Sequence, residues 1–240
     1  MGYFSGMVEH SPHPPALTEP VEDYLKAIYE LERRHGAAAT TDVAQVLQVA
    51  PASVTGMIRR LAQQGYLDHV PYKGVQLTPL GRRAALRTIR RHRILETYLT
   101  RVLGYPWDRV HDEAERLEHA ASDDLIACLA AAMGNPTEDP HGAPIPTVDG
   151  EVDERAHRTL ADLAVGETAR MVRVVSDKDS SFLRYLAEIS LQPGAEVTIV
   201  SRAPFDGPIT LRIGVAEPVV GPNLAARVLV DDIRSSRSAS

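Results

Sequence analysis

The sequence predicts a mainly α-helical fold with a small β part. Three observations lead to this prediction. Apolar residues recur at helical spacing through most of the first 133 residues, a glycine-tipped pair of short strands interrupts them, and short alternating segments fill about 65 residues near the C-terminus. The hydrophobic share of 44% is enough for ordinary globular cores. We therefore expect a few small folded parts rather than one large core.

The chain opens with a stretch rich in Gly, Ser, His and Pro, which we predict to be a disordered tail over 1–17. The first helix is predicted to begin after Thr18, a capping residue type, and Pro20 fits its first turn. Apolar residues then recur at helical spacing until Gly36, which is typical of a helix end. We expect this helix to be the first element of an N-terminal domain.

A short helix opening near Thr40 and a third helix beginning at Pro51 follow. Two short alternating strands come next, and the glycine of 71–74 between them suits a hairpin tip. Helix, short helix, basic helix and basic hairpin together describe a winged helix-turn-helix. We predict this domain over 18–81.

The next predicted domain, 82–134, is helical. A long basic helix leaves the wing, a second helix ends near His119, and Ser122 caps a third helix. One face of that third helix is apolar and built of small side chains, across which two helices can approach closely. Its residues are Leu125, Cys128, Leu129 and Ala132.

Residues 135–164 are rich in Pro, Gly and Asp, and this composition predicts a linker with one helical turn in it. The last domain, 165–232, holds short strands, a turn and one short helix beginning near Phe182. Several short strands in so few residues indicate a small β-barrel.

The lone cysteine, Cys128, excludes an internal disulfide scaffold and a Cys-based zinc finger, so it is expected in a core or a dimer interface. The N-terminus shows no secretion signal, and no apolar run reaches the roughly 18 residues that span a bilayer. We therefore expect a protein of the reducing cytoplasm with no membrane partner.

Charge is distributed unevenly along the chain. The whole chain carries −6, whereas residues 40–93 hold nine basic and two acidic side chains and carry +7. A basic block in an acidic protein predicts a polyanionic partner for that block. A solvated charged helix explains it equally well, because six of the nine basic residues fall between Arg82 and Arg93.

No nucleophile motif and no glycine-rich phosphate loop is present, so the candidate chemistry is metal binding rather than catalysis. Glu115, Glu118 and His119 recur at helical spacing and share one face of a helix. His92 and Glu96 form a similar pair on the preceding helix. Solvated helices often carry one such pair, but two sets on consecutive helices after a winged helix indicate a metal site.

Five ordered motifs resemble the diphtheria toxin repressor family of metal-dependent transcriptional regulators, and more closely its manganese-responsive branch. They are 22–29 (EDYLKAIY), 53–58 (SVTGMI), 77–81 (LTPLG), 91–96 (RHRILE) and 111–119 (HDEAERLEH). The resemblance covers about residues 18–133, and a weaker one to the family's SH3-like domain covers about 165–232. It implies a C-terminal SH3-like β-barrel after the helical dimerisation and metal-binding domain.

The resemblance also implies two metal sites. The ligands of the main site are Asp23 on the first helix with Glu115, Glu118 and His119. Those of the second site are His92, Glu96 and His111, joined by an oxygen from the SH3-like domain, for which Asp179 or Asp177 is the candidate. Ordinary structural roles are the alternative, with His111 as a core histidine and Asp23 as a surface acid paired with Lys26.

The ligand types point to Mn²⁺. Iron-type members have Met and Cys at the positions of Asp23 and Glu115, and hard carboxylates with one imidazole suit Mn²⁺ better than sulfur would, although Fe²⁺ also uses them. The two-domain manganese regulators carry a Glu where this chain has Lys26. We therefore expect two separate sites rather than a two-metal cluster.

DNA recognition is expected from the start of the third helix, which meets base edges in helix-turn-helix docking. The residues there are Pro51, Ala52, Ser53, Thr55 and Gly56. They are small, which predicts modest direct readout supported by thymine methyl contacts and DNA shape. Arg59 and Arg60 on the third helix, and Lys73 on the wing, are placed for contacts with phosphates. Packing is the alternative explanation for Gly56.

We predict a homodimeric, Mn²⁺-activated repressor, with Fe²⁺ as the other possible ion, that binds a palindromic double-stranded operator of metal-uptake genes and is not an enzyme. One alternative is a metal-independent winged-helix regulator that senses a small molecule, whose DNA binding survives chelation. The other is a metal-dependent hydrolase using Glu115, Glu118 and His119, in which a basic wing would have no purpose.

Overall fold

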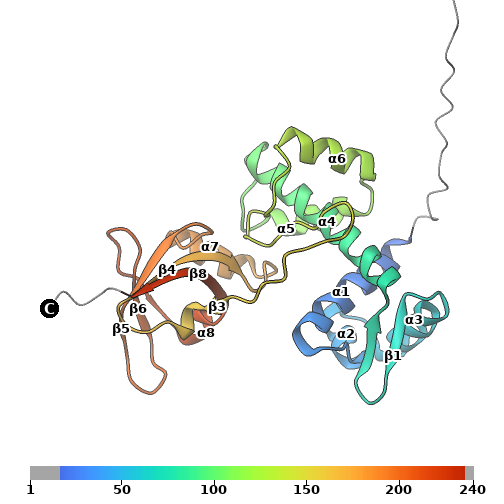
Figure 1. The fold of residues 1–240 in the computed structure, drawn as a ribbon, viewed down its shortest axis with the longest axis horizontal. Coiled ribbons are helices and arrows are strands. Elements are labelled where there is room, and N and C mark those ends of the chain that lie inside the picture. The colour runs from blue at the N-terminus through green and yellow to red at the C-terminus, as the bar shows by residue number, and fades with distance from the viewer. Residues whose placement is uncertain (1–16, 236–240) are drawn as a thin grey trace, which may run out of the picture. The chain divides into compact units, whose positions relative to one another are not determined.

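The computed structural model describes residues 17–235, and the chain divides into two compact units, Met1–Ala85 and Leu86–Ser240 (Figure 1). Apart from Leu17, the tail predicted over 1–17 lies outside the described residues. Among the described helices, none is long and apolar enough to cross a membrane. The long helix α4, Pro79–Arg101, contains the boundary between the units.

The first unit is the predicted winged helix-turn-helix. Its other elements are α1 (Glu19–His35), α2 (Thr40–Leu47), α3 (Pro51–Gln63), β1 (Leu67–Val70) and β2 (Gly74–Leu77). The two strands pair antiparallel with Leu67 opposite Leu77, and Figure 1 shows this hairpin beside α3. The core consists of side chains that the helical spacing puts on one face of each helix. They include Leu25, Ile28, Val54, Ile58 and Leu61.

The second unit begins with a helical part made by most of α4, by α5 (Val110–Glu118) and by α6 (Asp123–Ala132). The predicted cap is confirmed, because the Leu125 N–H donates to Ser122 Oγ at 3.2 Å. Ile126 and Ala130 of α6 face the core. On the face predicted for close helix approach, Leu125, Cys128 and Ala132 are exposed in the single chain, whereas Leu129 packs against the core. A core role for Cys128 is therefore wrong, and an interface role remains.

The segment predicted as a linker, 135–164, is packed in its first half. Asp139 is 4% exposed and His141 is 1% exposed. Arg90 of α4 donates from Nη1 to the carbonyl oxygen of Pro146 at 2.7 Å, and a second arginine of α4 binds another proline carbonyl of the segment. Composition predicted a free linker because Pro and Gly oppose regular structure, but carbonyl groups of this segment still accept hydrogen bonds from α4.

Much of the basic charge on α4 is used inside the second unit. Arg87 and Arg91 both pair with Asp123 at the start of α6. Together with the arginines that bind the 135–164 segment, they hold two parts of the chain, the start of α6 and that segment, against α4. Several of the basic residues between Arg82 and Arg93 are therefore explained by contacts within the protein, without a polyanionic partner.

The C-terminal part is a six-stranded antiparallel sheet in the order β3-β8-β4-β5-β6-β7. Its elements are β3 (Arg158–Thr159), a 3₁₀ turn (Leu160–Asp162), β4 (Glu167–Val174), α7 (Ser180–Glu188), β5 (Glu196–Arg202), β6 (Ile209–Arg212), β7 (Val219–Val220), α8 (Pro222–Ala225) and β8 (Val228–Ser235). Leu183 and Leu186 of α7 share a core with strand residues such as Ile199. The predicted small β domain is confirmed. The two-residue strands are too short to show a sequence period and were not predicted.

Candidate metal centre

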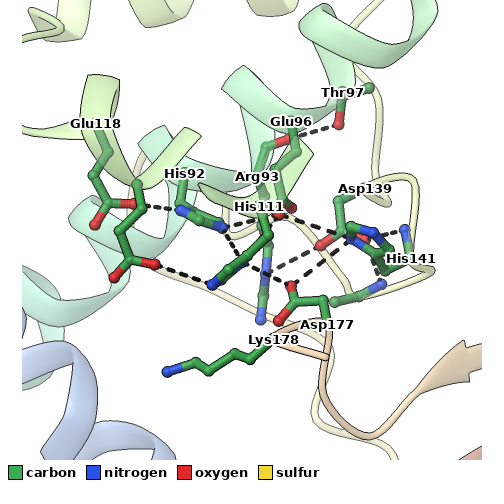
Figure 2. Close-up of polar contacts among 12 residues, drawn as sticks. His92, Arg93, Glu96, Thr97, His111, Glu118, Asp139, His141, Asp177 and Lys178 are labelled. Carbon is green, nitrogen blue, oxygen red and sulfur yellow. Dashed lines mark hydrogen bonds and ion pairs between the residues drawn. The ribbon is translucent and has the colours of Figure 1, made fainter. Parts of the chain in front are cut away.

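Three residues of the predicted second site lie together in the second unit (Figure 2). One turn of α4 separates His92 from Glu96, and α5 brings His111 against them. His92 Nε2 lies 3.0 Å from Glu96 Oε1 and 3.0 Å from His111 Nδ1, and His111 Nδ1 lies 3.4 Å from Glu96 Oε1. Ligand atoms that bind one cation at about 2.1 Å lie about 3 Å apart when they are adjacent. These three donor atoms therefore have the spacing of ligands of one ion.

The fourth group is Asp177, from the loop before α7, and not Asp179. Asp177 Oδ2 lies 3.5 Å from His111 Nδ1. Asp179 instead caps α7, because its Oδ1 accepts the Phe182 N–H at 3.0 Å, and its Oδ2 pairs with Arg227 at 3.2 Å. Of the two candidate aspartates, the structure brings Asp177 to the cluster and uses Asp179 as a cap, since a helix N-terminus attracts the carboxylate that lies at its cap position.

Sequence analysis missed two further residues, Asp139 and His141, in the 135–164 segment. His141 Nδ1 lies 3.8 Å from Glu96 Oε1 and 3.8 Å from Asp177 Oδ2. Asp139, His141, Glu96 and Asp177 form a second group whose ligand atoms all lie within 4.8 Å of one another. The one sequence signal for them is the Asp-x-His spacing of two possible metal ligands, which in a segment rich in Pro and Gly is equally typical of a turn.

The residues of this cluster fit a divalent cation. Glu96 is fully buried, and neither its Oε2 nor His141 Nδ1 has a hydrogen-bond partner among the described residues. Buried acceptors without partners are unfavourable, so native proteins rarely keep them unless another group binds there. Carboxylate oxygens and imidazole nitrogens that face one point are ligands that Mn²⁺ and Fe²⁺ accept.

The electrostatics of the cluster also favour positive charge at its centre. Burial alone would raise the pKa of Glu96, but the three neighbouring histidines hold it well below its usual range. Burial alone would lower the pKa of His111, yet the contact with Asp177 and two further carboxylates raises it to about 12. Against the same effect of burial, Glu96 raises the pKa of His141 to about 9. The carboxylates thus require a cation or protonated imidazoles beside them.

The predicted ligands Glu115, Glu118 and His119 lie at the end of α5. Glu118 is fully buried, and its Oε2 lies 2.5 Å from His92 Nδ1. Glu115 Oε2 lies 3.0 Å from His111 Nε2. Each of these carboxylates therefore contacts an imidazole of the second set, so the two ligand sets in this unit are direct neighbours.

The remaining predicted residues belong to the first unit. Asp23 lies half-buried on α1. The predicted DNA contacts are all exposed on α3 and on the tip of the wing: Pro51, Ala52, Ser53, Thr55, Gly56, Arg59, Arg60 and Lys73. Sequence analysis did not single out Tyr72, which is fully exposed at the wing tip with a φ of 64°.

Three family profiles match the chain in order. The N-terminal DNA binding domain of the iron dependent repressors matches residues 16–75, their metal binding and dimerisation domain matches 78–147, and the FeoA domain matches 158–232. The iron-dependent repressor IdeR of Mycobacterium tuberculosis is 30% identical over 224 residues, which are 89% of this chain and 96% of that protein. The chain belongs to the iron-dependent repressor family.

A second repressor and a solved structure are also similar to this chain over most of their length. The diphtheria toxin repressor of Corynebacterium diphtheriae is 29% identical over 226 residues, which are 90% of this chain and 99% of that protein. A solved manganese-dependent transcriptional repressor, in complex with manganese, has a TM-score of 0.79 and 40% identity over 88% of this chain and 98% of its own.

Membership of the iron-dependent repressor family confirms the predicted function at the level of the family. The chain is a metal-dependent transcriptional repressor with a DNA-binding domain and a domain for divalent metal binding and dimerisation. It binds its DNA operator as a dimer. The repressor prediction is thereby confirmed over the hydrolase and the metal-independent regulator.

Proposed function

We propose that this repressor is activated by Mn²⁺ and controls genes of metal uptake. The observation that carries the proposal is the chemistry of the donors gathered in the second unit, which are imidazole nitrogens and carboxylate oxygens. Cys128, the one cysteine, lies exposed on α6. Oxygen and imidazole ligands suit Mn²⁺, whereas thiolates select softer ions. The manganese-dependent repressor that is 40% identical to this chain supports the same ion.

The main ion is proposed to be held by Glu115, Glu118 and His119 of α5 together with Asp23 of α1. Asp23 belongs to the DNA-binding unit and the other three to the metal-binding unit. An ion that needs both sets of ligands favours the orientation of the DNA-binding unit in which all four reach it. A hundredfold preference for that orientation corresponds to about 2.7 kcal/mol, which is a sizeable allosteric coupling.

The second centre is proposed to hold its ion through His92, Glu96, His111 and Asp177, with His141 and Asp139 beside them. His92 also acts on the main set, because its Nδ1 contacts Glu118. When His92 Nε2 faces a cation, its proton resides on Nδ1, where it donates to the Glu118 carboxylate and orients it. The second centre therefore supports the main one by fixing a ligand.

Metal-controlled operator binding tests the proposal. We would select a palindromic duplex from a random library with the Mn²⁺-loaded protein and measure its binding by fluorescence anisotropy, first with a chelator and then with added Mn²⁺ or Fe²⁺. We expect chelation to weaken specific binding strongly and Mn²⁺ to restore it at lower concentration than Fe²⁺. An unrelated duplex at low salt is the control, because its binding rests on phosphate contacts and should change little. Restoration by Fe²⁺ alone would refute the choice of ion.

A further inference from the structure

Gly56 lies in the middle of α3, the predicted recognition helix, on its exposed face. Glycine is unfavourable inside a helix, because it loses more backbone freedom on folding than any other residue. Its presence there needs a compensating reason, which lies either in the packing of the protein or in its contact with DNA.

Packing does not supply that reason. Among the described residues, a Cβ added at Gly56 would meet no atom within 4 Å apart from the helix's own neighbouring backbone. The other described glycines of the same unit each have a structural reason: Gly36 and Gly65 have a positive φ, and two more lie against backbone. A Cβ at Gly81 would collide with the carbonyl oxygen of Tyr66, and one at Gly74 would collide with that of Ala38. The fold explains Gly74 and Gly81, and it leaves Gly56 without an explanation.

The turns of α3 that precede Gly56 carry only small side chains, and the arginines Arg59 and Arg60 follow one turn later. Residues 51–58 contain no amide, guanidinium or ammonium group that could read a base edge. Thr55 donates its hydroxyl hydrogen to the carbonyl oxygen of Pro51 at 3.1 Å, so it offers DNA a methyl group and oxygen lone pairs. Such a face suits apolar contact, and the apolar feature of the major groove is the thymine methyl group.

We propose that Gly56 makes room for the 5-methyl group of one thymine in each operator half-site, so that the missing side chain is itself a specificity determinant. The helix then lies close to the base edges, and any larger residue at position 56 collides with that methyl group. This inference rests on the proposed function only in using the Mn²⁺-loaded protein, since the DNA-binding domain is common to the whole family.

The test adds one methyl group to the protein and removes one from the DNA. We would compare wild type and Gly56→Ala, both full-length and Mn²⁺-loaded, on the selected duplex and on duplexes in which one thymine per half-site is replaced by deoxyuridine. We expect Gly56→Ala to raise the melting temperature of the free protein, because alanine favours the helix. We expect it to weaken operator binding about tenfold. Deoxyuridine at one position should bring the variant back to within about threefold of the affinity of wild type for thymine.

Gln63→Ala is the matched control, since it also raises helix propensity and adds no atom near Gly56; we expect unchanged operator affinity. The inference is overturned if Gly56→Ala binds the selected duplex as wild type does. It is also overturned if the variant is weakened equally on thymine and deoxyuridine at every position. If wild type binds the selected duplex equally with and without Mn²⁺, the proposed function is refuted. The comparison of thymine with deoxyuridine still tests the role of Gly56 in that case.

Discussion

His141 donates a hydrogen bond from Nε2–H to the carbonyl oxygen of Trp107 at 2.7 Å. A carbonyl only accepts, so Nε2 carries a proton and Nδ1 is the ring nitrogen that faces the carboxylates of Glu96 and Asp177. The ring also lies against Trp107 with 5.3 Å between centroids, which restrains its orientation. The 135–164 segment is thus more than a connection, because it places an imidazole beside the candidate metal centre.

The first prediction separates the two aspartates near α7. Asp177→Ala should remove a ligand and abolish Mn²⁺ binding at the second centre, leaving one binding event per chain in calorimetric titration. Asp179→Ala should leave both binding events intact and lower the stability of the second unit by about 1 kcal/mol, as the loss of a helix cap does. Loss of a binding event in Asp179→Ala, with none in Asp177→Ala, would reverse the assignment.

The contribution of the Asp179 cap to the stability of the second unit depends on pH. Hydrogen bonds from Ser181 and from the Phe182 N–H, together with Arg227, lower the pKa of Asp179 to about 2. A depressed carboxyl pKa stabilises the fold above the unfolded value of about 3.9, and the contribution is lost as pH falls through the folded value. The stability difference between wild type and Asp179→Ala should therefore be complete at pH 7 and shrink between about pH 4 and pH 2. A constant difference down to pH 2 would show that the cap does not need its charge.

The second prediction concerns the switch. Asp23→Ala removes the ligand on the DNA-binding unit, so metal still binds the other three residues but no longer biases that unit. We expect near-complete loss of Mn²⁺-activated operator binding. His92→Ala removes one ligand of the second centre and the partner of Glu118, and we expect a partial loss. Mn²⁺ titration of operator binding checks both variants, and salt-sensitive binding to an unrelated duplex is the control that should survive. A wild-type response in Asp23→Ala would place the switch elsewhere.

The third prediction concerns ion choice. Glu115→Cys puts a soft thiolate where the chain has a hard carboxylate. We expect the order of activation to shift from Mn²⁺ toward Fe²⁺, Co²⁺ or Ni²⁺. The measurement is the concentration of each ion that gives half-maximal operator binding, for wild type and variant under anaerobic conditions. An unchanged order would mean that Glu115 does not bind the ion.

The fourth prediction concerns dimerisation through α6. Leu125 is 48% exposed and lies with Cys128 on the apolar face that the single chain leaves uncovered. Leu125→Glu should bring charge into the interface and raise the dimer dissociation constant about tenfold or more, which sedimentation velocity measures. Ala127→Glu is the matched control, because Ala127 is exposed on a different face of the same helix. Equal effects of the two changes would show that the interface lies elsewhere.

The longer helices and strands, and the ligands that share one helix, follow from the amino-acid sequence alone. Helical spacing of apolar residues predicted the core faces of α1 and α3, and the alternating residues around a glycine predicted the wing. Local geometry also puts His92 within reach of Glu96, since residues four apart are neighbours on any α-helix. Such relationships depend only on the backbone period, so they can be derived before the chain is folded.

Long-range packing, in contrast, sets which distant groups complete the site. Asp177 and Asp179 are chemically identical and two residues apart, and their roles separate only when the start of α7 takes one carboxylate as its cap. His141 lies 45 positions after Glu96 in a segment with no period, so no local pattern links them. On α6, apolar residues occupy both sides, and packing alone buries Ile126 while it leaves Leu125 exposed. The physical reason is that the repeat of a helix or strand determines which side chains share a face, whereas long-range packing determines which other parts of the chain contact that face.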